Sequence, residues 1–130
     1  MKKILVIIAI LSAGVAQAQN KNAKASIEVD GVCGMCKVRI EKAAVKTIGV
    51  KTAIWNMETH ELSLIYNGKK TSLDSIEKNI AAVGHDTPNY KASDEAYDSI
   101  DMCCKYRDPS VVDDHKKMNG KHGDGHDGGE

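Results

Sequence analysis

The cysteine pair Cys33 and Cys36 constrains this chain more than any other feature. The pair stands where an extended run, 26–30, gives way to a run of helical character, 37–44. A helix that begins there leaves its first backbone N–H groups without partners and directs the positive end of its dipole toward the sulfurs. Both effects favour the thiolate, which binds soft cations such as Cu(I) and Zn(II) or attacks disulfides. The sequence therefore predicts a strand-to-helix junction that carries a soft-metal site or a redox-active pair.

The first 18 residues have the pattern of an export signal. A short basic start precedes an apolar stretch, 4–16, and Ala16-Gln17-Ala18 is a small-x-small cleavage motif. The apolar stretch is short for a membrane span, although an uncleaved anchor is the alternative. We expect a signal peptide over 1–18 and a mature chain that begins at Gln19. That chain would be periplasmic or secreted, with no stable membrane anchor.

Charge and composition exclude one class of partner and limit the core. Basic and acidic residues balance at 18 each, and no basic stripe with interleaved aromatic residues is present. Nucleic acid is therefore not an expected partner. Phe is absent and Trp55 is the single Trp, so the core must consist mainly of Ile, Leu, Val and Ala. Because such a small core is marginal, a bound metal or a disulfide would stabilise it.

Periodicity predicts the order strand, helix, strand, strand, helix, strand. Strands are expected over about 25–30, 50–56, 62–66 and 86–91, and helices over about 36–48 and between Thr71 and Gly84. Thr71 with Asp74 fits a capping box, and Gly49 and Gly84 are stop signals. Pro88 marks the last strand as an edge strand.

Two split β-α-β units of this kind make an α+β, ferredoxin-like βαββαβ sandwich. Its four-stranded antiparallel sheet would carry both helices on one face. Alternation in the second strand permits either Ala53 and Trp55 or Thr52 and Ile54 to face inward. The charged residues of the first helix are expected to form a solvated face; they are Lys37, Arg39, Glu41, Lys42 and Lys46. Lys37 could also offset the negative charge of a metal bound to two thiolates.

Three landmarks over residues 24–92 resemble the heavy-metal-associated (HMA) domain. They are the stretch 30–37 around the cysteine pair, Gly49-Val50 after the first helix, and 82–86 after the second. The family includes copper chaperones, N-terminal modules of copper-transporting ATPases and periplasmic mercury-binding proteins. The resemblance implies the ferredoxin-like fold, with Ala53 and Trp55 inward. Gly31 departs from it, since the family usually has Met there.

Cys33 and Cys36 are the expected primary metal ligands. Two thiolates in near-linear geometry suit Cu(I) first, with Hg(II) as an alternative, whereas Zn(II) requires four ligands and would be half coordinated by this pair. A structural disulfide is the competing interpretation. His85 stands where the family commonly has Tyr, Lys or Phe, and it is either a third ligand or a loop residue that merely fills that position.

Residues 93–112 form an extension that lies beyond the part of the chain that resembles the HMA domain. A short helix, 94–100, capped by Ser93, is expected before the adjacent pair Cys103-Cys104. If this segment folds back over the first pair, four sulfurs could surround one site. The alternatives are a disulfide with Cys33 or Cys36, or two independent thiols. The tail, 113–130, is expected to be disordered, with His115, His122 and His126 available for weak metal binding at most.

These features predict an exported protein that captures, buffers or transfers Cu(I) and is not an enzyme. Its partner would be a metal-transporting ATPase or another metal-handling protein. A thiol–disulfide oxidoreductase is the first rival, because such proteins also place Cys-x-x-Cys at a helix start. Val32 and Gly34-Met35 stand where those proteins usually have Trp and Pro. A disulfide-linked module that binds partners through its sheet edge is the second rival.

Overall fold

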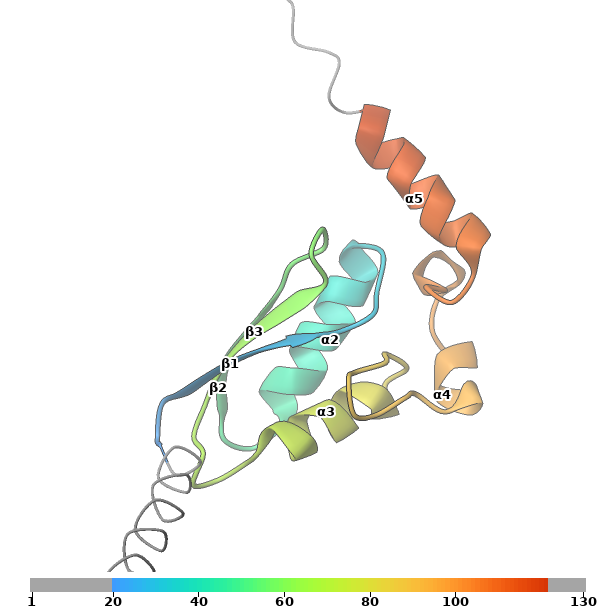
Figure 1. The fold of residues 1–130 in the computed structure, drawn as a ribbon. Coiled ribbons are helices and arrows are strands. Elements are labelled where there is room, and N and C mark those ends of the chain that lie inside the picture. The colour runs from blue at the N-terminus through green and yellow to red at the C-terminus, as the bar shows by residue number, and fades with distance from the viewer. Residues whose placement is uncertain (1–19, 122–130) are drawn as a thin grey trace, which may run out of the picture.

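The computed structural model describes residues 20–121, in which a three-stranded sheet and two helices precede a helical extension (Figure 1). The elements are β1 (Ala23–Glu28), α2 (Gly34–Lys46), β2 (Val50–Trp55), β3 (Glu61–Tyr66), α3 (Leu73–Ala82), α4 (Asp94–Asp98), the 3-10 turn η2 (Met102–Cys104) and α5 (Pro109–Lys121). The predicted signal peptide and the end of the tail, with His122 and His126, lie outside the described residues. Within residues 20–121, no helix has the length and apolar character needed to cross a membrane.

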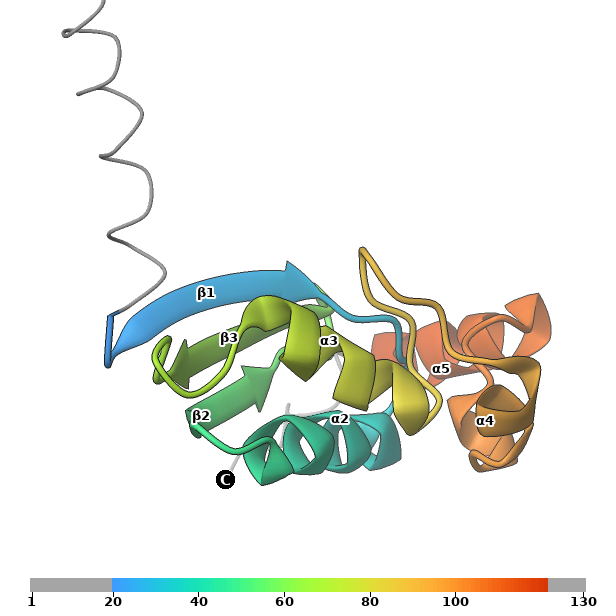
Figure 2. The ribbon, with the colours of Figure 1, turned by 90° about the horizontal axis from the view of Figure 1, so that it is seen from below.

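The sheet has the strand order β1-β3-β2, and both pairings are antiparallel. Leu62 of β3 lies opposite Ile27 of β1 and Trp55 of β2, and all three side chains are buried. Helices α2 and α3 lie side by side over this apolar face (Figure 2). In β2, Ala53 and Trp55 face the core while Thr52 and Ile54 are exposed, as the family resemblance predicted.

The fourth strand expected over 86–91 is not formed. The backbone N–H of Asp30 donates to the carbonyl oxygen of Asp86 at 3.0 Å, but the chain then turns, with a bond from Thr87 N–H to Tyr90 O at 2.8 Å. Pro88 lies in that turn and has no N–H to donate to a strand ladder. The described sheet therefore has three strands. The predicted fourth strand is reduced to a single backbone hydrogen bond between Asp30 and Asp86.

Helix boundaries differ from the prediction at their starts. Helix α2 begins at Gly34, two residues early, with Cys33 as an extended N-cap residue (φ −142°, ψ 175°). Ser72, and not Thr71, caps α3, since its side chain accepts a bond from Ser75 N–H at 3.3 Å. Both glycine stops are present, and Gly49 and Gly84 adopt φ values of 99° and 106° that side chains disfavour.

The extension is ordered by contacts with the end of α3. Ser93 caps α4 as predicted, accepting a bond from Ala96 N–H at 3.1 Å. Helix α4 approaches Gly84 so closely that a Cβ there would lie 2.6 Å from Ile100 and 2.8 Å from the carbonyl oxygen of Ala96. Gly84 therefore serves two purposes, because it ends α3 and admits the extension.

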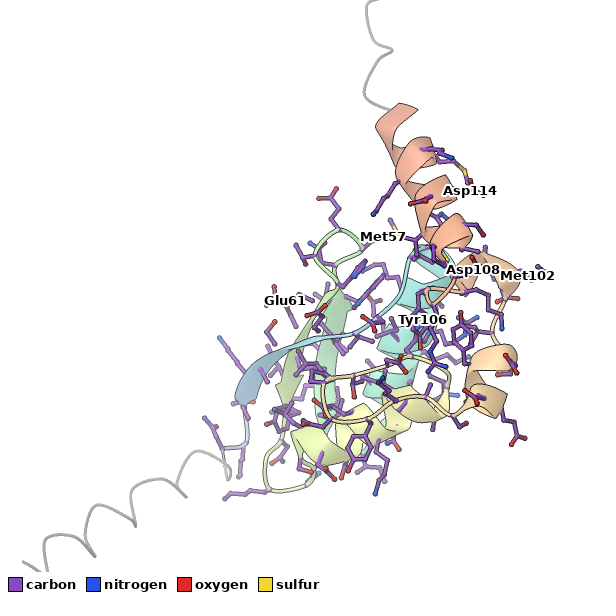
Figure 3. The ribbon with its side chains drawn as sticks, turned by 45° about the vertical axis from the view of Figure 1, so that its right-hand side comes forward. Met57, Glu61, Met102, Tyr106, Asp108 and Asp114 are labelled. Carbon is purple, nitrogen blue, oxygen red and sulfur yellow. The ribbon has the colours of Figure 1, made fainter. Side chains whose placement is uncertain are left out.

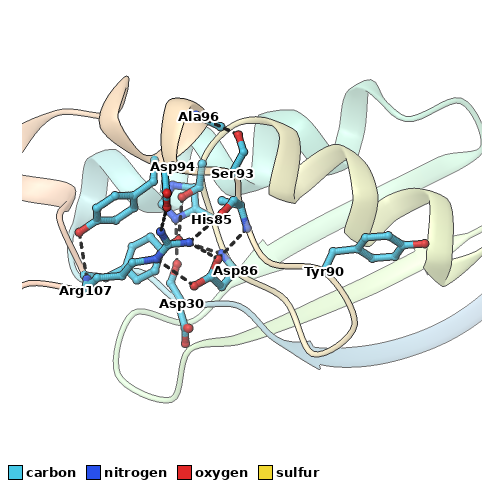
Figure 4. A network of polar contacts seen from close by, with 12 residues as sticks. Asp30, His85, Asp86, Tyr90, Ser93, Asp94, Ala96 and Arg107 are labelled. Carbon is cyan, nitrogen blue, oxygen red and sulfur yellow. Dashed lines mark hydrogen bonds and ion pairs between the residues drawn. The ribbon is translucent and has the colours of Figure 1, made fainter.

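Tyr106 and Arg107 fasten the extension to the loop after α3. Figure 4 shows Arg107 beside Asp86 of that loop. The Tyr106 hydroxyl donates to the carbonyl oxygen of Gly84 at 2.7 Å and accepts from Asp86 N–H at 3.0 Å. Arg107 pairs with the Asp86 carboxylate at 2.8 Å and donates to the carbonyl oxygen of Ala92 at 2.9 Å. This network determines where η2, just before it in the chain, must lie.

Residues 113–121, which the sequence assigned to a disordered tail, belong to α5 in the structure. Pro109 is the first residue of that helix, and the Asp108 carboxylate accepts a bond from Ser110 N–H at 2.9 Å. Val111 and Val112 pack against the core cluster. A capped start and an anchored first turn therefore let the helix continue through a polar sequence that has little apolar periodicity of its own.

Candidate metal centre

Four cysteine side chains gather where the first turn of α2 meets η2. The Cys33 sulfur lies 3.5 Å from that of Cys36 and 3.2 Å from that of Cys104. The sulfurs of Cys33, Cys103 and Cys104 all lie within 4.8 Å of one another. All four cysteines belong to the described part of the chain, and each is a free thiol there. The structure thus places the double-cysteine end of the extension beside the first pair.

The sulfurs differ in how readily they ionise. Burial opposes ionisation of Cys33, but hydrogen bonds from the backbone N–H of Cys36, from the Cys104 and Cys36 thiols and from Met35 N–H lower its pKa below the ordinary value. Burial raises the pKa of Cys36, and burial together with neighbouring sulfurs raises those of Cys103 and Cys104 to about 11 and about 12. Cys33 is therefore the cysteine of the cluster whose ionisation its surroundings favour most.

Arg39 provides the positive charge beside the cluster. Its guanidinium donates to the Asp101 carboxylate at 2.7 Å and lies at 3.4 Å from Nε2 of His85. Burial raises the pKa of Cys104 most strongly, while a hydrogen bond from Arg39 acts in the opposite direction. The sequence had assigned Arg39 to a solvated helix face. Its position three residues after Cys36, on the same side of a helix, was the available signal.

Lys37, the other cation considered for the site, has different partners. Its amino group pairs with Glu41 and donates to the carbonyl oxygen of Trp55 at 2.8 Å. Glu41 in turn accepts a bond from Trp55 N–H at 3.0 Å. Lys37 therefore ties α2 to β2, and Arg39 is the cation that acts to lower the pKa of Cys104.

His85 is buried, and both of its ring nitrogens have protein partners. Nδ1 lies 2.8 Å from the carbonyl oxygen of Asp30, so Nδ1 carries the proton and Nε2 faces Arg39. The ring also stacks on Tyr106 with centroids 5.5 Å apart. Burial lowers the pKa of His85 to about 4. This geometry makes His85 a neutral support for the metal loop and gives no support to the alternative that it is a third ligand.

Gly31 explains how the loop packs without the methionine usual in the resembling family. A Cβ at Gly31 would lie 3.0 Å from two ring atoms of Trp55 and 3.1 Å from Cβ of Cys36. The Trp55 indole N–H donates to the carbonyl oxygens of Val29 and His60 at 3.0 and 3.1 Å. The large indole thus lies directly beneath the cysteine loop, and only glycine leaves room for it.

Helix α5 also contacts the cluster. Nε2 of His115 lies 2.9 Å from the backbone carbonyl oxygen of Cys103. The sequence had placed His115 in a disordered tail with weak metal binding at most. In the structure, the imidazole is directed at the backbone of a cysteine, so its role is to hold η2 in position.

Comparison with known proteins gives two curated relatives. The copper-exporting P-type ATPase of Staphylococcus saprophyticus is 38% identical over 66 residues, which are 50% of this chain and 8% of that protein. That of Staphylococcus haemolyticus is 35% identical over 75 residues, 56% of this chain and 9% of that protein. The matched half of the chain is the half whose motifs resemble the heavy-metal-associated domain. The chain spans less than a tenth of the length of these relatives.

Solved structures give similar matches, while no family model matches the chain. The CopZ metallochaperone is 29% identical with a TM-score of 0.48, and the match covers 49% of this chain and 97% of that one. The N-terminal domain of a potential copper-translocating P-type ATPase from Bacillus subtilis is 28% identical with a TM-score of 0.49. That match covers 51% of this chain and 84% of the other. The matches leave about half of this chain without a counterpart.

Proposed function

We propose that this chain is an exported soft-metal-binding protein that captures and buffers Cu(I), or transfers it slowly, through Cys33, Cys36, Cys103 and Cys104. One observation carries the proposal. Cys33 and Cys104 are 71 positions apart, and their sulfurs lie 3.2 Å from each other. A fold that brings distant thiols together at a helix N-terminus, beside an arginine, concentrates the donors that soft cations prefer.

Burial of the sulfurs favours retention of the ion over rapid transfer. Cys33, Cys36 and Cys104 are 8%, 0% and 0% exposed. Transfer between thiolate sites proceeds by ligand exchange, in which an incoming sulfur must reach the bound ion before an original sulfur leaves. Because η2 covers the first turn of α2, the incoming thiolate has little access. The extension therefore makes the site a buffer in which release requires η2 to move.

Cu(I) is the proposed ion because thiolates at low coordination number suit it, and Hg(II) shares that preference. Four thiolates would also fill the tetrahedral shell of Zn(II), so Zn(II) is the alternative that the extension makes stronger. The copper-exporting relatives support Cu(I). A copper-transporting P-type ATPase, or another soft-metal-binding protein of the exported compartment, is the proposed partner. Export itself is proposed from the sequence of residues 1–18.

The test is Cu(I) binding against a competing chelator. Replacing both Cys33 and Cys36 with Ser should abolish stoichiometric binding, whereas unchanged affinity in that variant would overturn the proposal. Competition between Cu(I) and Zn(II) on the unmodified protein then identifies the preferred ion.

Thiol titration of protein isolated from its own compartment separates the rival class. The lowered pKa of Cys33 beside Cys36 is also what an oxidoreductase needs. Free thiols together with bound metal support the buffer, and a Cys33–Cys36 disulfide that turns over with substrate thiols supports the oxidoreductase.

A further inference from the structure

A thioether lies next to the thiol cluster. The sulfur of Met35, in the first turn of α2, is 3.5 Å from the sulfur of Cys103. Cys103 also belongs to the set of sulfurs that lie within 4.8 Å of one another with Cys33 and Cys104. Cys103 is therefore shared between an inner group of thiols and an outer thiol–thioether pair.

Solvent exposure separates the same outer pair, Met35 and Cys103, from the other three cysteines of the cluster. Met35 is 50% exposed and Cys103 is partly exposed, while the other three cysteines are buried. Met35 also lines an open groove on α2 together with Gly34, Val38, Arg39 and Lys42. An ion that arrives from solvent therefore meets Met35 and Cys103 before it reaches the inner sulfurs.

The chemistry of the outer pair differs from that of the inner one. A thioether is a soft, neutral donor that has no proton to lose, and it suits Cu(I). Zn(II) sites in proteins use Cys, His and carboxylate ligands instead. A methionine at the entrance thus favours Cu(I) or Ag(I) over Zn(II), without adding negative charge to a group of thiolates.

We propose that Met35 and Cys103 form an entry site that takes up a soft monovalent cation and passes it inward to Cys33 and Cys104. The proposal rests on the metal-binding function proposed above. At the entry site, the Cys103 thiol releases its proton to water as the metal–sulfur bond forms, while Met35 contributes a lone pair. As the ion moves inward, it keeps its bond to Cys103 and loses the bond to Met35. The Cys33 and Cys104 thiols release their protons to water as their sulfurs bind the ion.

The test uses Ag(I) as the probe and the protein with its extension intact. Carbon-13-labelled methionine methyl groups report on each thioether separately. Met102 is the matched reference, because it is adjacent to Cys103 and 82% exposed, and it lies on the outer side of the extension (Figure 3). Substoichiometric Ag(I) should shift the Met35 methyl resonance and leave that of Met102 in place. Met35→Leu, which keeps the side-chain volume, should slow Cu(I) uptake from a chelator about tenfold. Met102→Leu should not.

Two outcomes would overturn the entry site, and they bear differently on the function. If Ag(I) protects the thiols from alkylation while the Met35 resonance and the uptake rate of Met35→Leu stay unchanged, the entry site is wrong and the thiol site stands. If Ag(I) protects no thiol, the proposed function fails and the entry site fails with it. Equal shifts of Met35 and Met102 would also contradict the proposal, because they would indicate unspecific binding.

Discussion

Cys33 and Cys104 place their sulfurs 3.2 Å apart, although they belong to opposite ends of the folded chain. Cys33 occupies the N-cap position of α2 in the half of the chain that resembles the HMA domain, and Cys104 ends the short turn η2 in the extension. The contact joins a part of the chain that resembles copper-exporting ATPases to a part that lies beyond the matched half. Under the proposed function, retention of metal would therefore depend on the two parts together.

Removing the extension's thiols should convert the buffer into a faster-releasing site. Cys103→Ser with Cys104→Ser leaves Cys33 and Cys36 to bind Cu(I), but no sulfur covers the ion. We expect Cu(I) loss to a chelator to speed up by about tenfold or more, measured by stopped-flow absorbance. Met102→Leu serves as the control in the same turn. An unchanged rate would show that Cys103 and Cys104 neither bind nor shield the ion.

Arg39 should tune the reactivity of Cys104. Arg39→Gln removes the hydrogen bond that opposes the effect of burial on Cys104, so the pKa of that thiol should rise further and its alkylation should require higher pH. Asp101→Asn removes the ion pair but keeps the guanidinium, and it should leave the alkylation profile of Cys104 in place. Because the ion pair is partly exposed, neither change should cost more than about 1 kcal/mol of folding free energy. Identical profiles in Arg39→Gln and the unmodified protein would exclude this role.

His85 should make the metal-free protein sensitive to mild acid. Burial first, and then the nearby Arg39 guanidinium, hold its folded pKa at about 4, below its ordinary value of 6.5. Between these values the unfolded chain binds the proton and the folded one does not, so stability falls as the pH drops from about 6.5 toward 4. The loss amounts to roughly 3 kcal/mol once the pH is below 4.

The variant His85→Asn isolates this contribution, because its amide can donate to the Asp30 carbonyl as Nδ1 does and has no proton to gain. Urea unfolding at a series of pH values should show a flatter slope between pH 6.5 and 4 in the variant, whatever its absolute stability. The same slope in both proteins would mean that His85 does not control the loss of stability between pH 6.5 and 4.

Gly31 and Gly34 should respond oppositely to substitution by alanine. A Cβ at Gly31 would press on Trp55 at 3.0 Å, whereas a Cβ at Gly34 would meet no atom within 4 Å. We expect Gly31→Ala to lose about 1–3 kcal/mol through overpacking. Gly34→Ala should be neutral or gain up to about 1 kcal/mol, because alanine is the better helix former. Thermal unfolding of the two variants compares them, and equal stability would show that the loop and Trp55 are not tightly packed.

Local patterns predicted the parts of the fold that depend on nearby residues. The strand-to-helix junction at Cys33, the two glycine stops and the Ser93 cap are all determined by a few consecutive residues and by backbone hydrogen bonds. The inward face of β2 could not be chosen from alternation alone, because both faces carry apolar residues. The family resemblance resolved that choice in favour of Ala53 and Trp55.

Features that depend on distant contacts were beyond the sequence. A strand over 86–91 needed a partner beside β1, and the chain instead turns toward Tyr106 and Arg107 of the extension. The start of α5 carries ordinary helix signals, yet its continuation through 113–121 depends on Val111 and Val112 docking on the core. Proximity of Cys103 and Cys104 to the first pair was only a hypothesis, because the distance depends on how α4 packs against Gly84.

X-ray absorption at the copper edge of the Cu(I)-loaded protein tests the central claim most directly. If the extension completes the site, the ion should have more than two sulfur ligands in the unmodified protein, and two in the variant that carries Cys103→Ser with Cys104→Ser. Two sulfur ligands at the same distance in both proteins would contradict the account, because Cys33 and Cys36 would then hold the ion without the extension.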